Sequence, residues 1–200
     1  MFRPVSGALL AAALLVPLSA APSIASPAPV AVRTAAAPTT VLTIHAPGCE
    51  GCEITAHSAL TADYEDVWQS RAVEVVDGEA AFRVPTDRTH GLSLSLTAPW
   101  ERRLGYVTVV AMRYAGTVPG ETVGFRDARQ ERRATACWAG TSEASYDLTI
   151  RTRKVLVDGV APGRVPGTLA WARTTQDWLA PMRRVYGGVM GEQDIDFCEG

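Results

Sequence analysis

Alternation of apolar and polar residues is the dominant pattern in the chain after residue 40. In segments 53–60, 92–97 and 146–151, roughly every second residue is apolar or small, and the residues between are mostly polar or charged. A period of two predicts β-strands that bury one face and leave the other face in water. Segment 105–116 is apolar at both sets of alternate positions, so we expect a central strand there.

Turn signals separate the predicted strands. Asp77-Gly78 stands between two alternating runs and predicts a tight hairpin, because glycine accepts the positive φ angle that such turns require. Segments 117–130 and 158–167 are punctuated by glycine and proline and are expected to be connections. One short helix is expected over residues 175–188, with Thr175 or Asp177 as its cap and a glycine pair at its end.

These elements together predict an all-β domain. Short strands follow one another with turn signals between them, and strands do not alternate with long helices, which excludes folds built from β-α-β units. The fold class that fits best is an antiparallel two-sheet sandwich, immunoglobulin-like or transthyretin-like, with one short C-terminal helix.

The N-terminal segment has the order of an export signal. One basic residue, Arg3, precedes an apolar run over residues 5–18, and small residues follow. The apolar run is too short to cross a bilayer. We therefore expect a signal peptide over residues 1–25, a disordered Ala/Pro leader over 26–40, and a single β domain over 41–200. The predicted location is secreted, extracellular, without a membrane span after signal cleavage.

Charge narrows the set of partners. The formal net charge of −2 argues against nucleic acid as a partner. Segment 49–66 contains only acidic charges, whereas segment 126–133 contains four arginines. Mixed charge runs of this kind are typical of solvated faces.

The four cysteines predict two disulfides, because an even count in an exported domain is typical of a disulfide framework. Three pairings are open, and we favour Cys49–Cys52 with Cys137–Cys198. Two residues between Cys49 and Cys52 allow a turn, and Cys198 near the chain end needs a partner. In the chain-entropy model the long bridge contributes about 4 kcal/mol and the short bridge about 2 kcal/mol.

A metal site is an alternative for the first cysteine pair. His45, Cys49, Cys52 and His57 include two thiols and two imidazoles, a set that suits tetrahedral zinc, or copper(I) as a variant. Export disfavours this alternative, because the thiols would have to stay reduced. A thioredoxin-type redox motif is disfavoured as well, since the residues after Cys52 alternate like a strand.

Catalytic signatures are absent from the sequence. It contains no nucleophile-elbow, phosphate-loop or dinucleotide motif, so we assign no catalytic residue and no cofactor. Paired carboxylates of a small secreted hydrolase stay open, because their separation is a property of the three-dimensional structure. Of the five tryptophans, Trp100 and Trp178 are the candidates for exposed ligand platforms, and Trp138 is expected to pack against the Cys137 bridge.

Four segments carry a resemblance to other sequences. "VWQSRAVEV", "VPTDRTHGLSLSLTAPWE", "CWAGT" and "GEQDIDFC" resemble a group of uncharacterised small secreted β-rich proteins of high-GC Gram-positive bacteria. The resemblance implies a secreted β domain and transfers no functional residue. The leading hypothesis is a non-enzymatic binding module for a glycan, a cell-wall polymer or a protein. The metal-binding protein and the small hydrolase are the alternatives.

Overall fold

The computed structural model describes residues 38–61, 65–101, 108–158, 163–185 and 198. The predicted signal peptide and most of the predicted leader lie outside the described residues. The chain separates into residues 1–35 and 36–200, and all described residues belong to the second of these units.

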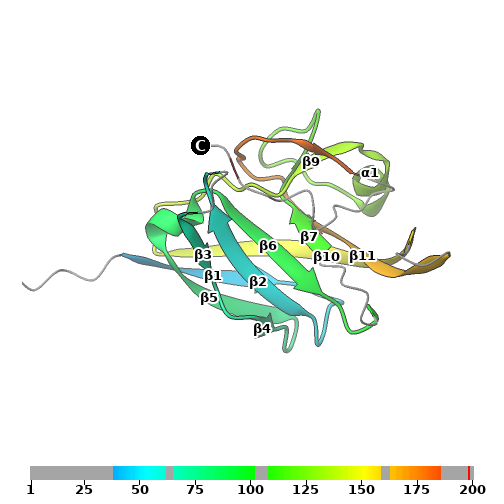
Figure 1. The fold of residues 1–200 in the computed structure, drawn as a ribbon, viewed down its shortest axis with the longest axis horizontal. Helices are drawn as coiled ribbons and strands as arrows, with labels where there is room; N and C mark the ends of the chain where they lie inside the picture. The colour runs from blue at the N-terminus through cyan, green and yellow to red at the C-terminus, as the bar shows by residue number, and fades with distance from the viewer. Residues whose placement is uncertain (1–37, 62–64, 102–107, 159–162, 186–197, 199–200) are drawn as a thin grey trace, which may run out of the picture. The chain divides into compact units, whose positions relative to one another are not determined.

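β-Strands make up most of the described chain, and they form two sheets (Figure 1). The large sheet has the order β3-β2-β6-β7-β11-β10-β1-β5, with β4 also paired to β2, and the small sheet has the order β12-β9-β8. The elements are β1 Thr39–His45, β2 Glu53–Ala59, β3 Val67–Gln69, β4 Val73–Glu74, β5 Glu79–Pro85, the 3-10 helix η1 Thr86–Thr89, β6 Leu92–Thr97, β7 Thr108–Ala111, β8 Arg113–Tyr114, α1 Phe125–Gln130, β9 Arg133–Thr135, β10 Ser145–Asp158, β11 Arg164–Ala172 and β12 Arg183–Arg184.

Two strand pairs in the large sheet are parallel, so the expectation of an antiparallel sheet is wrong. β1 runs parallel to β10, with Val41 opposite Ser145, and β7 runs parallel to β11, with Val110 opposite Ala170. Alternation reports which face of a strand is buried, but it carries no information on the direction of the neighbouring strand. The immunoglobulin-like or transthyretin-like sandwich is not confirmed, because one mixed sheet contains most of the strands.

One face of the large sheet curls around a first core. This core takes aliphatic side chains from β2 and β6 near one end of the strand order and from β1, β5 and β10 at the other end. Its largest fully buried members are Leu42, Ile44, Ile54, Leu92, Leu94, Leu96, Met112 and Ile150. Each such side chain contributes about 1.5–3 kcal/mol by burial. The predicted alternation of buried and exposed positions is confirmed in β2 and largely in β6, where Ser93 is buried as well.

β7 and residues 167–172 of β11 are buried on both faces. Val110 and Ala170 belong to the first core, whereas Val109 and Trp171 belong to a second core on the opposite face. Side chains of α1 and of the small sheet complete this second core, and Figure 1 shows α1 and β9 together on one side of β7 and β11. The predicted central strand within segment 105–116 is confirmed by β7, all of whose residues are buried.

The tight turn at Asp77-Gly78 is confirmed, but the two strands around it pair with other strands instead of forming a hairpin. Both residues have positive φ angles, 53° and 78°, and Val76 and Glu79 exchange backbone hydrogen bonds of 3.0 Å. The run before the turn is divided into β3 and β4, which pair with β2, and the run after it forms β5, which pairs with β1. The turn therefore links two parts of the large sheet.

The predicted C-terminal helix is wrong for the described part of segment 175–188. There the backbone of Asp177 and Leu179 forms hydrogen bonds with Ala139 and Cys137, at 3.0 Å each, and β12 follows. These long-range bonds replace the hydrogen bonds that a helix would make within itself. The one α-helix of the described residues is α1, which lies in the segment expected to be a connection.

The connection expected over residues 158–167 is shorter than predicted. Arg164–Gly167, expected in a loop, belongs to β11 and pairs with the end of β10. After Val185 the structure describes Cys198 alone. Within the described ranges, no helix is long and apolar enough to span a membrane.

Candidate functional site

The Cys49–Cys52 turn between β1 and β2 braces the structure. The two Sγ atoms are bonded at 2.05 Å, and both cysteines are fully buried in the first core. The Glu50 carboxylate accepts hydrogen bonds of 3.2 Å from the N–H groups of Asp77 and Gly78. The acid between the cysteines therefore holds the neighbouring hairpin turn in place.

The two histidines near this turn have separate surroundings. Nδ1 of His45 lies 3.1 Å from the Glu79 carboxylate, and Nε2 lies 3.5 Å from that of Asp147. His57 is half-buried on β2 between β3 and β6, and burial lowers its pKa below the ordinary value of 6.5. No group of three or more His, Cys, Asp or Glu among the described residues is arranged to hold a metal. The zinc or copper alternative therefore gains no geometric support.

The second disulfide joins Cys137 to Cys198, with an S–S distance of 2.00 Å. The backbone N–H of Cys198 donates to the carbonyl of Ala59, and its Sγ lies 3.6 Å from the hydroxyl of Ser93. Cys137 follows the small-sheet strand β9. This bridge therefore fastens the chain end to β2, β6 and the segment after β9. The structure contains both of the favoured cysteine pairs.

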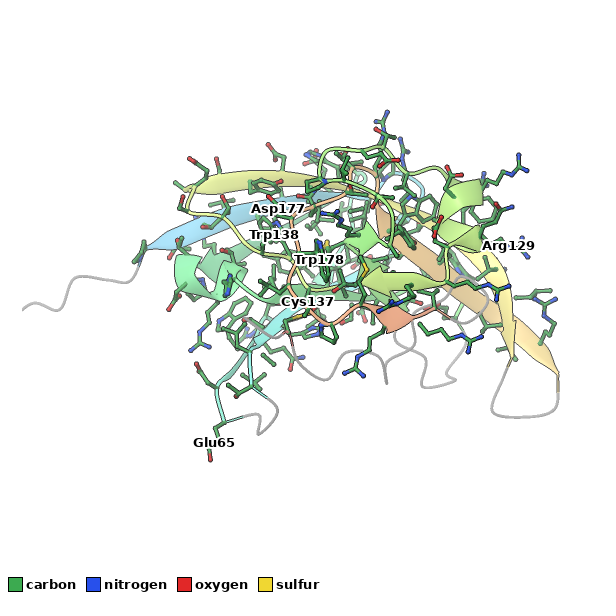
Figure 2. The ribbon with its side chains drawn as sticks, turned by 90° about the horizontal axis from the view of Figure 1, so that it is seen from above. Glu65, Arg129, Cys137, Trp138, Asp177 and Trp178 are labelled. Carbon is green, nitrogen blue, oxygen red and sulfur yellow. A yellow bond between two sulfur atoms is a disulfide. The ribbon has the colours of Figure 1, made fainter. Side chains whose placement is uncertain are left out.

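Trp138 and Trp178 lie next to each other beside Cys137 (Figure 2). Trp138 is buried in the first core, with its ring centre 4.8 Å from that of Tyr146. Trp178 is half-buried, and the guanidinium of Arg113 lies 5.8 Å from its ring centre. The Arg113 guanidinium therefore covers part of this ring.

Trp100 lies at a different place, in the wall of a cleft of about 680 Å³. Its indole N–H donates a 3.0 Å hydrogen bond to the Thr168 hydroxyl, and part of the ring packs on the first core. The opposite parts of the cleft come from β10, from the loop after β1 and from the segment that leads into α1. Of the two proposed platforms, Trp100 lines this cleft and Trp178 does not.

Hydrogen bonds between distant segments fix the cleft wall. Val123 N–H donates to the Arg173 carbonyl at 2.9 Å, and Arg173 N–H donates to the Thr149 carbonyl at 2.8 Å. The indole N–H of Trp171, which also lines the cleft, donates to the Val123 carbonyl at 2.9 Å. These bonds connect β10, the end of β11 and the segment before α1, so the cleft is formed before a ligand binds.

Among the described strands, none pairs with the edge of β10 beyond the end of β1. β1 pairs with β10 only as far as His45 opposite Thr149. Residues Arg151–Lys154 of β10 continue beyond that point and line the cleft. Backbone groups of an open strand edge are free to bond to a ligand.

The cleft is strongly cationic. Its described lining contains the four basic residues Arg151, Arg153, Lys154 and Arg173, and it contains no Asp, Glu or His. The guanidinium of Arg153 lies over the Phe125 ring, 5.3 Å from its centre, which is a cation–π contact. Like charges gathered in a concave surface focus a positive potential, which attracts an anionic group.

The basic residues of the cleft are not predicted from the sequence, because only continuous runs of charge along the chain were considered. Residues 126–133 form a visible arginine run, but the cations of the cleft come from β10 and from Arg173 after β11. A usable signal was present in segment 151–154, where three of four residues are basic within one predicted strand.

Comparisons with protein-family models, with curated proteins and with solved structures gave no significant match.

Proposed function

We propose that the protein is an exported, disulfide-stabilised binding module that holds an anionic ligand in the cationic cleft. The observation that carries the proposal is the lining itself, whose described residues bring four cations and two partly exposed aromatic rings together and include no carboxylate. A ligand with carboxylate or phosphate groups matches this chemistry, because guanidinium groups bind such oxygens with two parallel hydrogen bonds.

Binding is favoured over hydrolysis by the same lining. A glycosidase needs two carboxyl groups on either side of the bond that it cleaves, and the described cleft residues include none. A histidine base is missing from these residues as well. Export is supported by the two disulfides, since such bonds persist in oxidising compartments outside the cytosol.

A titration with a short acidic sugar tests the proposal. We expect trigalacturonate to bind at low salt, monitored by calorimetry, and its uncharged methyl ester to bind at least tenfold more weakly. The double variant Arg151→Ala/Arg173→Ala should weaken binding at least tenfold, because each lost hydrogen bond to a charged group costs about 1.5–3 kcal/mol.

A matched control separates the cleft from net charge. Arg71→Ala/Arg83→Ala removes two exposed arginines, Arg83 on β5 and Arg71 between β3 and β4, neither of them in the lining of the cleft. We expect this control to change the affinity less than twofold. Equal weakening by the two double variants would show that trigalacturonate responds to overall charge, and the proposed site would then be wrong.

A further inference from the structure

A second cleft of about 350 Å³ adjoins the cationic cleft. Its lining includes Arg129 of α1 and, on the β10–β11 hairpin, Leu156 and Arg164. Phe125 and Lys154 line both clefts, so the two hollows meet at these side chains. The described lining of the second cleft contains no acidic residue either.

The shared ring of Phe125 positions one arginine of each cleft. The guanidinium of Arg153, in the first cleft, lies 5.3 Å from the centre of this ring, and that of Arg129, in the second cleft, lies 6.0 Å from it. Figure 2 shows Arg129 on α1, well away from the pair of tryptophans beside Cys137. Cation–π contacts of this kind orient a guanidinium group without neutralising it.

The two clefts follow β10 as a continuous basic tract. From Arg151 to Leu156, at about 3.3 Å for each residue, the strand covers about 17 Å. The cations of the tract are Arg129, Arg151, Arg153, Lys154, Arg164 and Arg173. A single small anion occupies only a fraction of this length, whereas a chain with repeated negative groups can meet several cations at once.

We propose that the two clefts are adjoining subsites for one linear acidic glycan, a carbohydrate chain with repeated carboxylate groups. This inference rests on the proposed function and adds the class of ligand. Cations match the repeated charge, and the partly exposed Trp100 ring matches the apolar C–H face of a sugar ring. Leu156, whose side chain is 54% exposed, gives the second cleft a further apolar contact.

Chain length is the variable that tests this inference. Galacturonate oligomers from the dimer to the octamer are titrated against the full exported chain at one low salt concentration. We expect the affinity of the octamer to exceed that of the dimer at least tenfold, because the octamer reaches both clefts. Arg129→Ala/Arg164→Ala should lower the octamer's affinity to about the dimer's level, whereas the control Arg71→Ala/Arg83→Ala, outside both clefts, should change it less than twofold. Arg129 and Arg164 are both exposed, so the fold is expected to persist.

The outcomes separate this inference from the proposed function. If the dimer and the octamer bind equally well, or if Arg129→Ala/Arg164→Ala has no effect on the octamer, the two-subsite inference is wrong while the first cleft stands. If poly-glutamate of the same charge binds as tightly as the octamer, the carbohydrate class is wrong. If no oligomer binds, or if Arg151→Ala/Arg173→Ala has no effect on either length, the proposed function itself fails.

Discussion

The two cores on opposite faces of β7 and β11 are built from different side chains. Leucine, isoleucine and valine supply half of the buried members of the first core, and most of them lie on the longer strands. The second core combines two large aromatic residues, Tyr114 and Trp171, with several alanines from short elements. Branched aliphatic side chains fill space between two curled halves of a sheet, whereas alanines let short elements approach closely.

The surfaces above the two cores differ in charge as well. Around the Cys49–Cys52 turn, the exposed residues Glu50, Glu53 and Asp77 are acidic. Beside the second core, α1, β10 and β11 present the arginines of the two clefts. The strands around the first core therefore supply the stable frame, while the short elements beside the second core present the candidate binding surface.

The largest expected effect concerns the two disulfides, because one lies within the first core and the other ties distant segments together. Replacing Cys137 and Cys198 by alanine should lower the free energy of unfolding by about 4 kcal/mol, and replacing Cys49 and Cys52 by about 2 kcal/mol. The difference follows from the length of chain that each bridge closes, with separations of 61 and 3 residues. Urea unfolding of the two double variants measures it, and equal losses would contradict the expectation.

A matched pair of leucine truncations compares the two cores directly. Leu94→Ala in the first core should lower the free energy of unfolding by about 4 kcal/mol, and Leu169→Ala in the second core by about 2 kcal/mol. Both side chains are buried, at 0% and 3% exposure, so the chemical change is alike. The cavity in the second core should close more fully, because short elements shift more easily than the strands of a continuous sheet.

Urea unfolding measures this pair too, with hydrogen exchange to locate the loosened segments. A loss from Leu169→Ala as large as that from Leu94→Ala would show that the second core is as rigid as the first.

The smallest expected effect is a dependence of the unfolding free energy on pH, caused by His57 on β2. Burial lowers the pKa of His57 below 6.5 in the folded chain, so the unfolded chain binds the proton more readily. Above pH 6.5 His57 is neutral in both states, and the free energy of unfolding has its full value. As the pH falls below 6.5 the unfolded chain takes up the proton first, so the free energy of unfolding falls until the pH passes the lower, folded-state pKa. His57→Gln should therefore flatten the fall in unfolding free energy between pH 6.5 and 5. An identical pH profile for the variant and the parent chain would contradict this.

The strand faces of the first core were predictable because the signal is local. Leu92, Leu94 and Leu96 lie on one face by the geometry of a strand alone, and a period of two is visible without knowing any partner. The Asp77-Gly78 turn is likewise local, since both residues favour positive φ angles. In contrast, α1 has six residues, no side-chain cap and a single fully buried residue, Ala128, so its sequence carries no clear helical pattern.

The pairing of strands and the cleft depend on contacts between residues far apart in the chain. Nothing near β5 indicates that it pairs with β1 instead of the strand before it, and nothing near β10 indicates a parallel neighbour. The hydrogen bonds of Asp177 and Leu179 to the segment after β9 replaced the expected helix for the same reason.

The sequence by itself determined which residues face inward along the long strands and where the chain turns at Asp77-Gly78. It favoured one of three open cysteine pairings, and the structure contains that one. The tertiary structure decided the order and direction of the strands, and it gathered Trp100, Phe125 and Arg173 around the end of the β1–β10 pairing. The physical reason is the separation along the sequence over which each effect acts. Alternation and turn chemistry depend on neighbouring residues, whereas the cleft is formed by distant segments that come together only when the whole sheet packs.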